Sequence, residues 1–187
     1  MEILWIIVPV AVIALYAVGL YNSLVQLRQN RKNAFSDIDV QLKQRYDLVP
    51  ALVETVKGYA AHEKSVLENV TAARANVAAQ SGPGSAHLAA EQKLGGALMG
   101  LFAVAENYPA LKADANFQQL MAELSDIENK IAAARRFFNN ATSEYNTKVE
   151  QFPSSIVAGI FKFGGEAFYE DTSVERAVLE KAPGVKF

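Results

Sequence analysis

The chain has 187 residues, with 18 Lys and Arg against 20 Asp and Glu, a formal net charge of -2 and no cysteine. This length leaves room for one ordinary domain beside a short anchor, and argues against a second folded domain. The balanced charge and the lack of a long basic block argue against a nucleic-acid partner. Without cysteine, disulfides, thiolate catalysis and cysteine metal sites are excluded.

The first predicted element is an uncharged run of nineteen residues, from Ile3 to Tyr21. As a helix it spans roughly 28 Å, close to the thickness of a hydrocarbon core, so we predict a membrane-spanning anchor. Pro9 is tolerated in a bilayer, Leu15 lies in the apolar part, and Trp5 and Tyr21 fall where interfacial aromatics are favoured. The stronger alternative is a cleaved signal peptide, but the basic region that should precede one is missing. The weaker alternative is a buried helix of a soluble protein.

Charges on the two sides of the anchor predict its orientation. Arg28, Arg31 and Lys32 follow the run before any acid appears at Asp37, whereas only the amino terminus and Glu2 precede it. The positive-inside bias therefore places the N-terminus outside and the following domain in the cytoplasm. A periplasmic domain remains the alternative.

Beyond the anchor, apolar residues recur at spacings of three and four, which predicts an all-α domain. In the first segment one register holds Phe35, Ile38, Leu42, Val49, Leu52, Val56, Tyr59, Val66, Val70 and Val77. Such a heptad predicts one long amphipathic helix with coiled-coil-like packing. Pro50 deprives the carbonyl of Tyr46 of its helical hydrogen bond, so a kink or a full break is required; the unshifted register favours a kink.

The same register places Arg45 and Glu63 at seam positions. Either they are buried and paired with an opposite charge, or a straight helix drifts from the seven-residue repeat and leaves them at the rim, which we favour. With charges elsewhere on the helices they form a candidate interaction or structural polar network: Arg45, Glu54, Glu63, Glu128, Arg135 and Arg136.

Two further helices complete the predicted antiparallel bundle of three long helices. The glycine- and proline-containing stretch 81–85 predicts an exposed turn, followed by a second helix with apolar residues from Leu88 to Ala105. Asp114 is a predicted N-cap for the third helix. Its apolar stripe is the clearest in the chain: Phe117, Leu120, Leu124, Ile127, Ile131, Ala134 and Phe138.

After residue 151 the chain changes character. Pro153 ends the third helix, and Ser154 or Ser155 is expected to cap a short apolar helix over 156–161. An aromatic cluster includes Phe161, Phe163, Phe168 and Tyr169, and with Ile160 it forms a candidate interface patch. We favour a flap packed over the bundle core; an interfacial segment or a partner-docking patch is the alternative. The predicted divisions are the anchor (1–22), the long-helix bundle (23–151) and the short helix with a polar tail (152–187).

No motif for catalysis, metal binding or a cofactor is present. His62 lacks the second histidine four residues later that a helical zinc-protease site requires, and His87 is isolated. A carboxylate-bridged metal site would need a Glu-x-x-His pair on each of two helices, and neither histidine has a glutamate three positions before it. Glycine-rich phosphate loops and nucleophile elbows are absent as well, so we predict that the protein is not an enzyme.

Several runs together resemble the LemA family: 21–25, 37–50, 53–60, His62-Glu63, Glu106-Asn-Tyr-Pro109, 124–128, Ala134-Arg-Arg-Phe137, Tyr145-Asn146 and Phe152-Pro-Ser154. The resemblance implies a single-pass protein of the bacterial cytoplasmic (inner) membrane without assigned chemistry, with relatives associated with magnetosome membranes. It suggests a membrane scaffold that forms homo-oligomers, or alternatively an adaptor of a membrane metalloprotease of the HtpX type in membrane-protein quality control. Many members carry a lipoprotein cysteine before the Tyr-Asn run; here Gly19-Leu20 stand there, which excludes lipidation and leaves the membrane side open.

Overall fold

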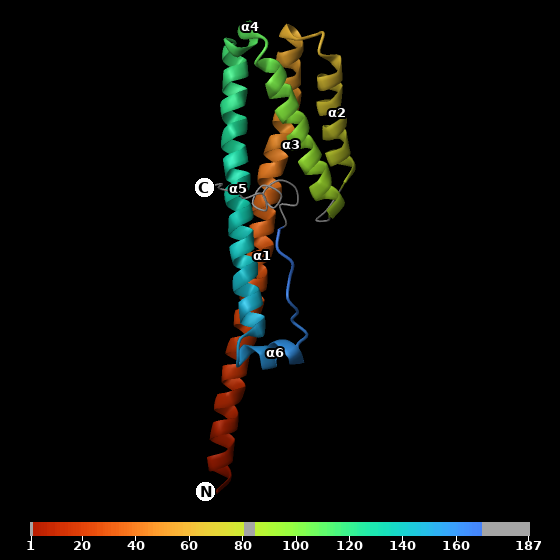
Figure 1. Cartoon of the computed structure of the whole chain (residues 1–187). Helices are drawn as coiled ribbons and strands as arrows, with labels where there is room; N and C mark the ends of the chain where they lie inside the picture. Colours follow the sequence, from red (N-terminus) through yellow and green to blue (C-terminus); the bar gives the residue numbers. More distant parts are fainter. Residues whose placement is uncertain (1, 81–84, 170–187) are drawn as a thin grey trace, which may run out of the picture. The chain divides into compact units, whose positions relative to one another are not determined.

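The computed structural model describes residues 2–80 and 85–169, and within them helices are the only regular secondary structure (Figure 1). The helices are α1 (Glu2–Tyr59), α2 (Lys64–Ala79), α3 (Ser85–Ala105), α4 (Pro109–Lys112), α5 (Ala115–Glu150) and α6 (Ser154–Ile160). The predicted all-α class and bundle packing are confirmed. The chain divides into two compact units: unit 1 takes Met1–Ser36 and Ala134–Phe187, and unit 2 takes Asp37–Ala133.

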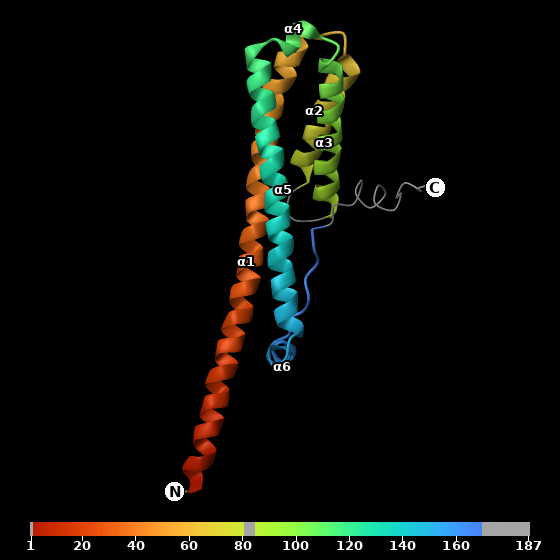
Figure 2. The same ribbon diagram turned by 60° about the vertical axis from the view of Figure 1, so that its left-hand side comes forward.

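Unit 2 is a bundle built from the second half of α1, the first part of α5, and α2, α3 and α4. Helices α2 and α3 lie side by side and run in opposite directions, as both views show (Figures 1 and 2). The predicted turn at 81–85 that joins them lies largely outside the described residues. One apolar core fills the unit, and its fully buried members include Val56, Ala60, Val70, Leu94, Leu101 and Leu111.

The prediction of a single long helix through the first heptad segment is wrong. Helix α1 ends at Tyr59 and α2 begins at Lys64, with Glu63 in a non-helical conformation (φ -84°, ψ 47°). The amide of Glu63 donates to the carbonyl of Ala60 at 3.0 Å, which closes the turn between the helices. The four-residue connection happens to preserve the seven-residue spacing between Tyr59 and Val66, so two separate core-facing stripes mimic one. The bundle therefore contains four long helices rather than three.

Pro50 lies within α1, so a full break at this position is excluded. Proline has no amide hydrogen, which frees the carbonyl of Tyr46 four residues earlier. That carbonyl accepts a hydrogen bond from Nε of Arg74 on α2 at 3.2 Å. The same guanidinium lies over the Tyr46 ring, 3.9 Å from its centroid. The Tyr46 carbonyl, which has no helical donor because of the proline, thus forms a hydrogen bond that joins α1 to α2.

Helix α5 begins as predicted. The carboxylate of Asp114 accepts a hydrogen bond from the amide of Phe117 at 2.9 Å, which is the N-cap geometry. The hydroxyl of Tyr59 donates to the other oxygen of Asp114 at 2.8 Å. The Phe117 amide and then the Tyr59 hydroxyl lower the pKa of Asp114 below its ordinary value. One side chain therefore starts α5 and joins it to the end of α1.

Unit 1 contains the first part of α1, the second part of α5, and α6. Its core joins Leu24 of α1, Tyr145 of α5, and Val157, Ala158 and Phe163 of the C-terminal region. Figures 1 and 2 show α6 lying across the end of α5 rather than along it. Burial of Tyr145 raises the pKa of its hydroxyl, and Glu166 adds to the increase while Arg28 and Arg31 oppose it.

The prediction that a serine caps α6 is wrong. Helix α6 starts at Ser154, Pro153 occupies the N-cap position, and no side chain caps the helix there. The Ser154 hydroxyl lies instead within hydrogen-bonding distance of the carbonyls of Lys148 and Gln151, at 2.6 and 2.7 Å. These carbonyls belong to the end of α5 and the turn after it, where helical acceptors lack intrahelical partners. The Ser154 hydroxyl therefore interacts with backbone carbonyls at the end of α5 rather than with the amides at the start of α6.

The anchor region occupies the first part of α1, which is the one helix in the described residues that is long and apolar enough to cross a membrane. Its apolar side chains point outward: Trp5, Val8, Leu15 and Val18 are exposed, as is Pro9. Tyr21 is half-buried against the C-terminal region. The side chain of Ile3 lies outside the described part of the structure. Such outward exposure suits a helix surrounded by lipid.

Candidate functional site

A buried ionic cluster joins three helices of unit 2. Arg45 of α1 is 3 % exposed and forms an ion pair with Glu91 of α3, which is 2 % exposed. Its Nη1 donates to Oε1 of Glu128 on α5 at 2.8 Å, and Nη2 also reaches the backbone carbonyl of Glu91 at 3.3 Å. The rim position favoured for Arg45 is therefore wrong, because two carboxylates offset the cost of removing its charge from water.

The electrostatics of Arg45 follow from these contacts. Burial alone lowers the pKa of a guanidinium, but the carboxylates of Glu128 and Glu91 outweigh that effect and raise the pKa of Arg45. Arg45 thus remains a permanent cation held between two anions. This arrangement ties α1 to α3 and α5.

Sequence reasoning missed Glu91, although a signal was present. Counting back from the core residues Leu98 and Leu94 in steps of four and three reaches Glu91 and then His87, so both lie on the inner side of α3. Burying an unpaired charge is costly, so a charged residue at a core position of one helix is expected to pair with an opposite charge at a core position of another. The register of α3 could therefore have identified Glu91 as the partner of Arg45.

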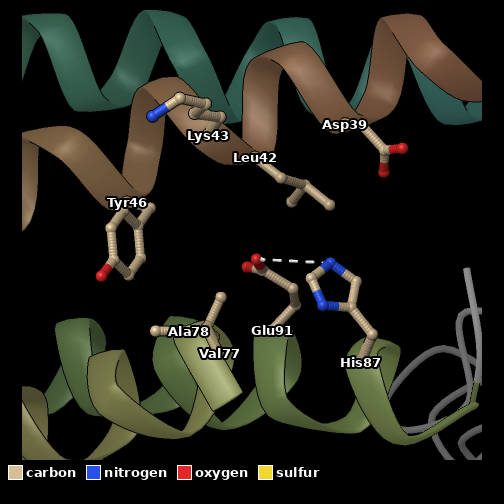
Figure 3. Close-up of a pocket in the computed structure, with 8 residues that line it drawn as sticks. All are labelled: Asp39, Leu42, Lys43, Tyr46, Val77, Ala78, His87 and Glu91. Carbon is tan, nitrogen blue, oxygen red and sulfur yellow. Dashed lines mark ion pairs between the residues drawn. The ribbon is translucent and has the colours of Figure 1, made fainter. Parts of the chain in front are cut away.

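Beside the cluster lies a cavity of about 370 Å³ between α1, α2 and α3 (Figure 3). Figure 3 shows His87 and Glu91 pointing toward each other, with Nε2 and Oε1 separated by 3.9 Å. Asp39 and Lys43 line the cavity from α1; burial raises the pKa of Asp39, and His87 partly opposes that increase. Within the described ranges no three His, Asp or Glu side chains are placed to hold a metal ion.

The other residues of the predicted polar network do not join this cluster. Glu54 is exposed and forms a weak pair with Lys57 at 3.7 Å. Glu63 accepts a hydrogen bond from the Tyr108 hydroxyl at 3.2 Å. In unit 1, Arg135 lies over the ring of Tyr169, 4.9 Å from its centroid, and Arg136 is exposed. Of the six predicted residues, Arg45 and Glu128 are in direct contact.

A C-terminal strap, defined here as residues 164–169, runs along α5 in the direction opposite to the helix. Asn146 makes two hydrogen bonds with the backbone of Glu166, at 2.8 and 2.9 Å. One heptad earlier, Asn139 makes the same pair with the backbone of Tyr169, at 2.8 and 3.3 Å. Arg31 adds a third attachment, because Nη2 donates to the carbonyl of Ala167 at 2.9 Å.

The three predicted topology-setting residues differ in their surroundings. Arg31 is half-buried; its Nε donates to the Thr142 hydroxyl at 3.1 Å and it pairs with Glu166 at 3.2 Å. Arg28 lies over the Phe163 ring, 5.0 Å from the centroid, and Lys32 is exposed. Arg31 therefore has a structural role in holding the strap, in addition to the charge on which the orientation prediction rests.

The candidate interface patch divides into two parts. Phe163 is buried and Tyr169 is half-buried against Phe138, with ring centroids 6.3 Å apart. Ile160, Phe161 and Phe168 remain exposed, although one side of the Phe161 ring contacts Tyr21. The expectation of a flap is thus wrong for these three residues, because the inner side of the segment already fills the core of unit 1 and leaves the outer side uncovered.

Comparison with known proteins places this architecture in a family. A model of the LemA family matches residues 34–187. The magnetosome protein MamQ 2 of Paramagnetospirillum magneticum is 26 % identical, across 90 % of this chain and 72 % of its own length. MamQ of Magnetospirillum gryphiswaldense is 25 % identical, across 85 % and 68 %. Protein LemA of Metamycoplasma hominis is 24 % identical, across 95 % and 81 %.

These matches extend over both units. The apolar first part of α1, together with relatives named as magnetosome proteins, supports a membrane protein. Since the family model covers most of its residues, the chain belongs to the LemA family.

Proposed function

We propose that the protein is a non-catalytic helical scaffold that is held at a membrane by its N-terminal helix and self-associates there. The observation that carries this proposal is the structural use of its buried charges. Arg45 pairs with both Glu91 and Glu128, and these two ion pairs connect three helices. The charges of this cluster are paired with one another inside the fold, which suits internal support of the bundle.

Self-association is expected from confinement in a membrane. A single anchor holds copies in one plane at high effective concentration, so weak contacts between the sides of long helices suffice for assembly. Full-length protein in mild detergent should behave as a large, discrete oligomer by size-exclusion chromatography with light scattering. The proposal predicts that this mass persists on dilution; a monomer across the whole concentration range would contradict it.

The orientation with the N-terminus outside and the helical domain in the cytoplasm is part of the proposal. Because the chain has no cysteine, one introduced at the exposed Lys130 would be its only thiol. In intact spheroplasts the K130C variant should resist a membrane-impermeant maleimide and react after permeabilisation. Labelling without permeabilisation would place the domain on the outer side.

A second candidate function is an adaptor for a membrane metalloprotease of the HtpX type, which the LemA resemblance suggests. The observation in its favour is Phe168, whose side chain is exposed while hydrogen bonds hold the backbone of Ala167 and Tyr169 on either side. An aromatic side chain in a fixed position can bind with little loss of entropy. F168A should reduce recovery of the protease with the full-length protein and F168Y should preserve it; undiminished recovery with F168A would remove Phe168 from this role.

A further inference from the structure

Helix α6 lies beside the residues with which the apolar run of α1 ends. Its inner side contributes Val157 and Ala158 to the core of unit 1, where Ala17, Leu20 and Tyr21 of α1 pack against the same cluster. Tyr21 contacts the rings of Phe161 and Phe163, with centroids 4.8 and 5.6 Å away. Residues 17 to 24 span roughly 10 Å along the helix axis, so these contacts place α6 at the end of the membrane-spanning segment.

The outer side of α6 is apolar and uncovered. Four large side chains on or directly beside α6 are exposed: Phe152 by 77 %, Ile156 by 55 %, Ile160 by 69 % and Phe161 by 58 %. Ile156 and Ile160 are spaced by four residues within α6 and therefore share one side, while Phe152 and Phe161 lie just before and just after the helix. Contiguous apolar surface of this kind marks contact with another apolar phase, since leaving it in water is unfavourable.

The neighbours of this surface suit the boundary of a bilayer. Arg28 lies over the Phe163 ring at 5.0 Å, and Lys162 directly follows the exposed Phe161. Aromatic residues with adjacent cations are favoured where acyl chains meet phosphate headgroups. The outer side of α6 is also continuous with the apolar surface of the anchor, because Phe161 rests on Tyr21.

We propose that α6 and its flanking residues form an interfacial segment whose exposed side chains Phe152, Ile156, Ile160 and Phe161 insert into the same bilayer that the anchor crosses. Its ligands are lipid acyl chains, with headgroup phosphates beside Arg28 and Lys162. A single transmembrane helix leaves a protein free to rotate about the membrane normal and to tilt. A second attachment point beside the anchor restricts the tilt of unit 1 and gives it a defined face toward the membrane.

Collision accessibility of spin labels tests this proposal in the full-length protein, reconstituted in phosphatidylcholine vesicles containing phosphatidylglycerol. The absence of cysteine allows single labels at I156C and I160C, with L15C as the lipid control and E144C, exposed on α5, as the water control. Circular dichroism establishes that each labelled variant retains its helices. Oxygen partitions into the acyl region, whereas a neutral nickel chelate stays in water.

Labels at Ile156 and Ile160 should lose collisions with the nickel chelate, down to the level at Leu15, while remaining accessible to oxygen. Nickel accessibility equal to that at Glu144 would show a surface in water and overturn the proposal. Protection from both reagents would also overturn it, because that result indicates a protein partner on α6.

Discussion

The buried ion pair between Arg45 and Glu91 provides the sharpest test of how unit 2 is held together. Replacing Glu91 by leucine removes the carboxylate, keeps a side chain of similar size and leaves the Arg45 cation buried. Losing one partner of a buried pair costs about 3–5 kcal/mol. Glu128 remains and is half exposed. We therefore expect the lower end, about 3 kcal/mol, which corresponds to a roughly 150-fold increase in the opening constant.

Hydrogen exchange of backbone amides measures this opening in the full-length protein, without requiring that both units unfold together. Exchange should accelerate in peptides from α3 and from residues 37–59 of α1. The control is K43A, which removes an exposed pair with Asp47 and should change stability by less than about 1 kcal/mol. Combining E91L with R45M removes both buried charges and should restore much of the protection. Equal exchange in E91L and K43A would refute the reasoning.

Three further predictions concern single contacts. The folded-state pKa of Asp114 is lowered, so its stabilising effect is complete above the ordinary aspartate pKa of about 4 and is lost as pH falls through the folded-state value. D114N should therefore reduce the fall in melting temperature at acid pH, and an unchanged fall would contradict the N-cap role. R74A should lower the free energy of unfolding by about 1 kcal/mol, because it leaves the Tyr46 carbonyl unpaired. The loss should be smaller in a P50A background, where residue 50 regains an amide that can bond this carbonyl, and equal losses in both backgrounds would show no coupling. N146A, which removes two hydrogen bonds, should increase proteolysis within the strap, whereas strap cleavage at the wild-type rate would argue against this attachment.

Patterns within one helix were predictable from the sequence. The uncharged run, the apolar stripe of α5 and the Asp114 cap depend on neighbours within a few residues, and the structure contains them. The break between α1 and α2 was not predictable from periodicity, because a connection of four residues preserves the phase of the repeat. Identifying it requires the packing of α2 on α3, which is a contact between helices.

The surroundings of charged and polar side chains were harder to predict for the same reason. Arg45 is buried because Glu91 and Glu128 arrive from two other helices, and no spacing along α1 contains that information. Asn139 and Asn146 occupy the polar side of α5 and resemble ordinary solvated residues. Their partners are backbone groups of the strap, and backbone groups leave no residue-type signal in a sequence.

The two asparagines hold the strap through its peptide groups, so the side chains of the strap contribute nothing to these four hydrogen bonds. A substitution at Phe168 therefore changes the chemistry displayed at that position while leaving the path of the backbone intact. The same backbone path is therefore compatible with different side chains at position 168.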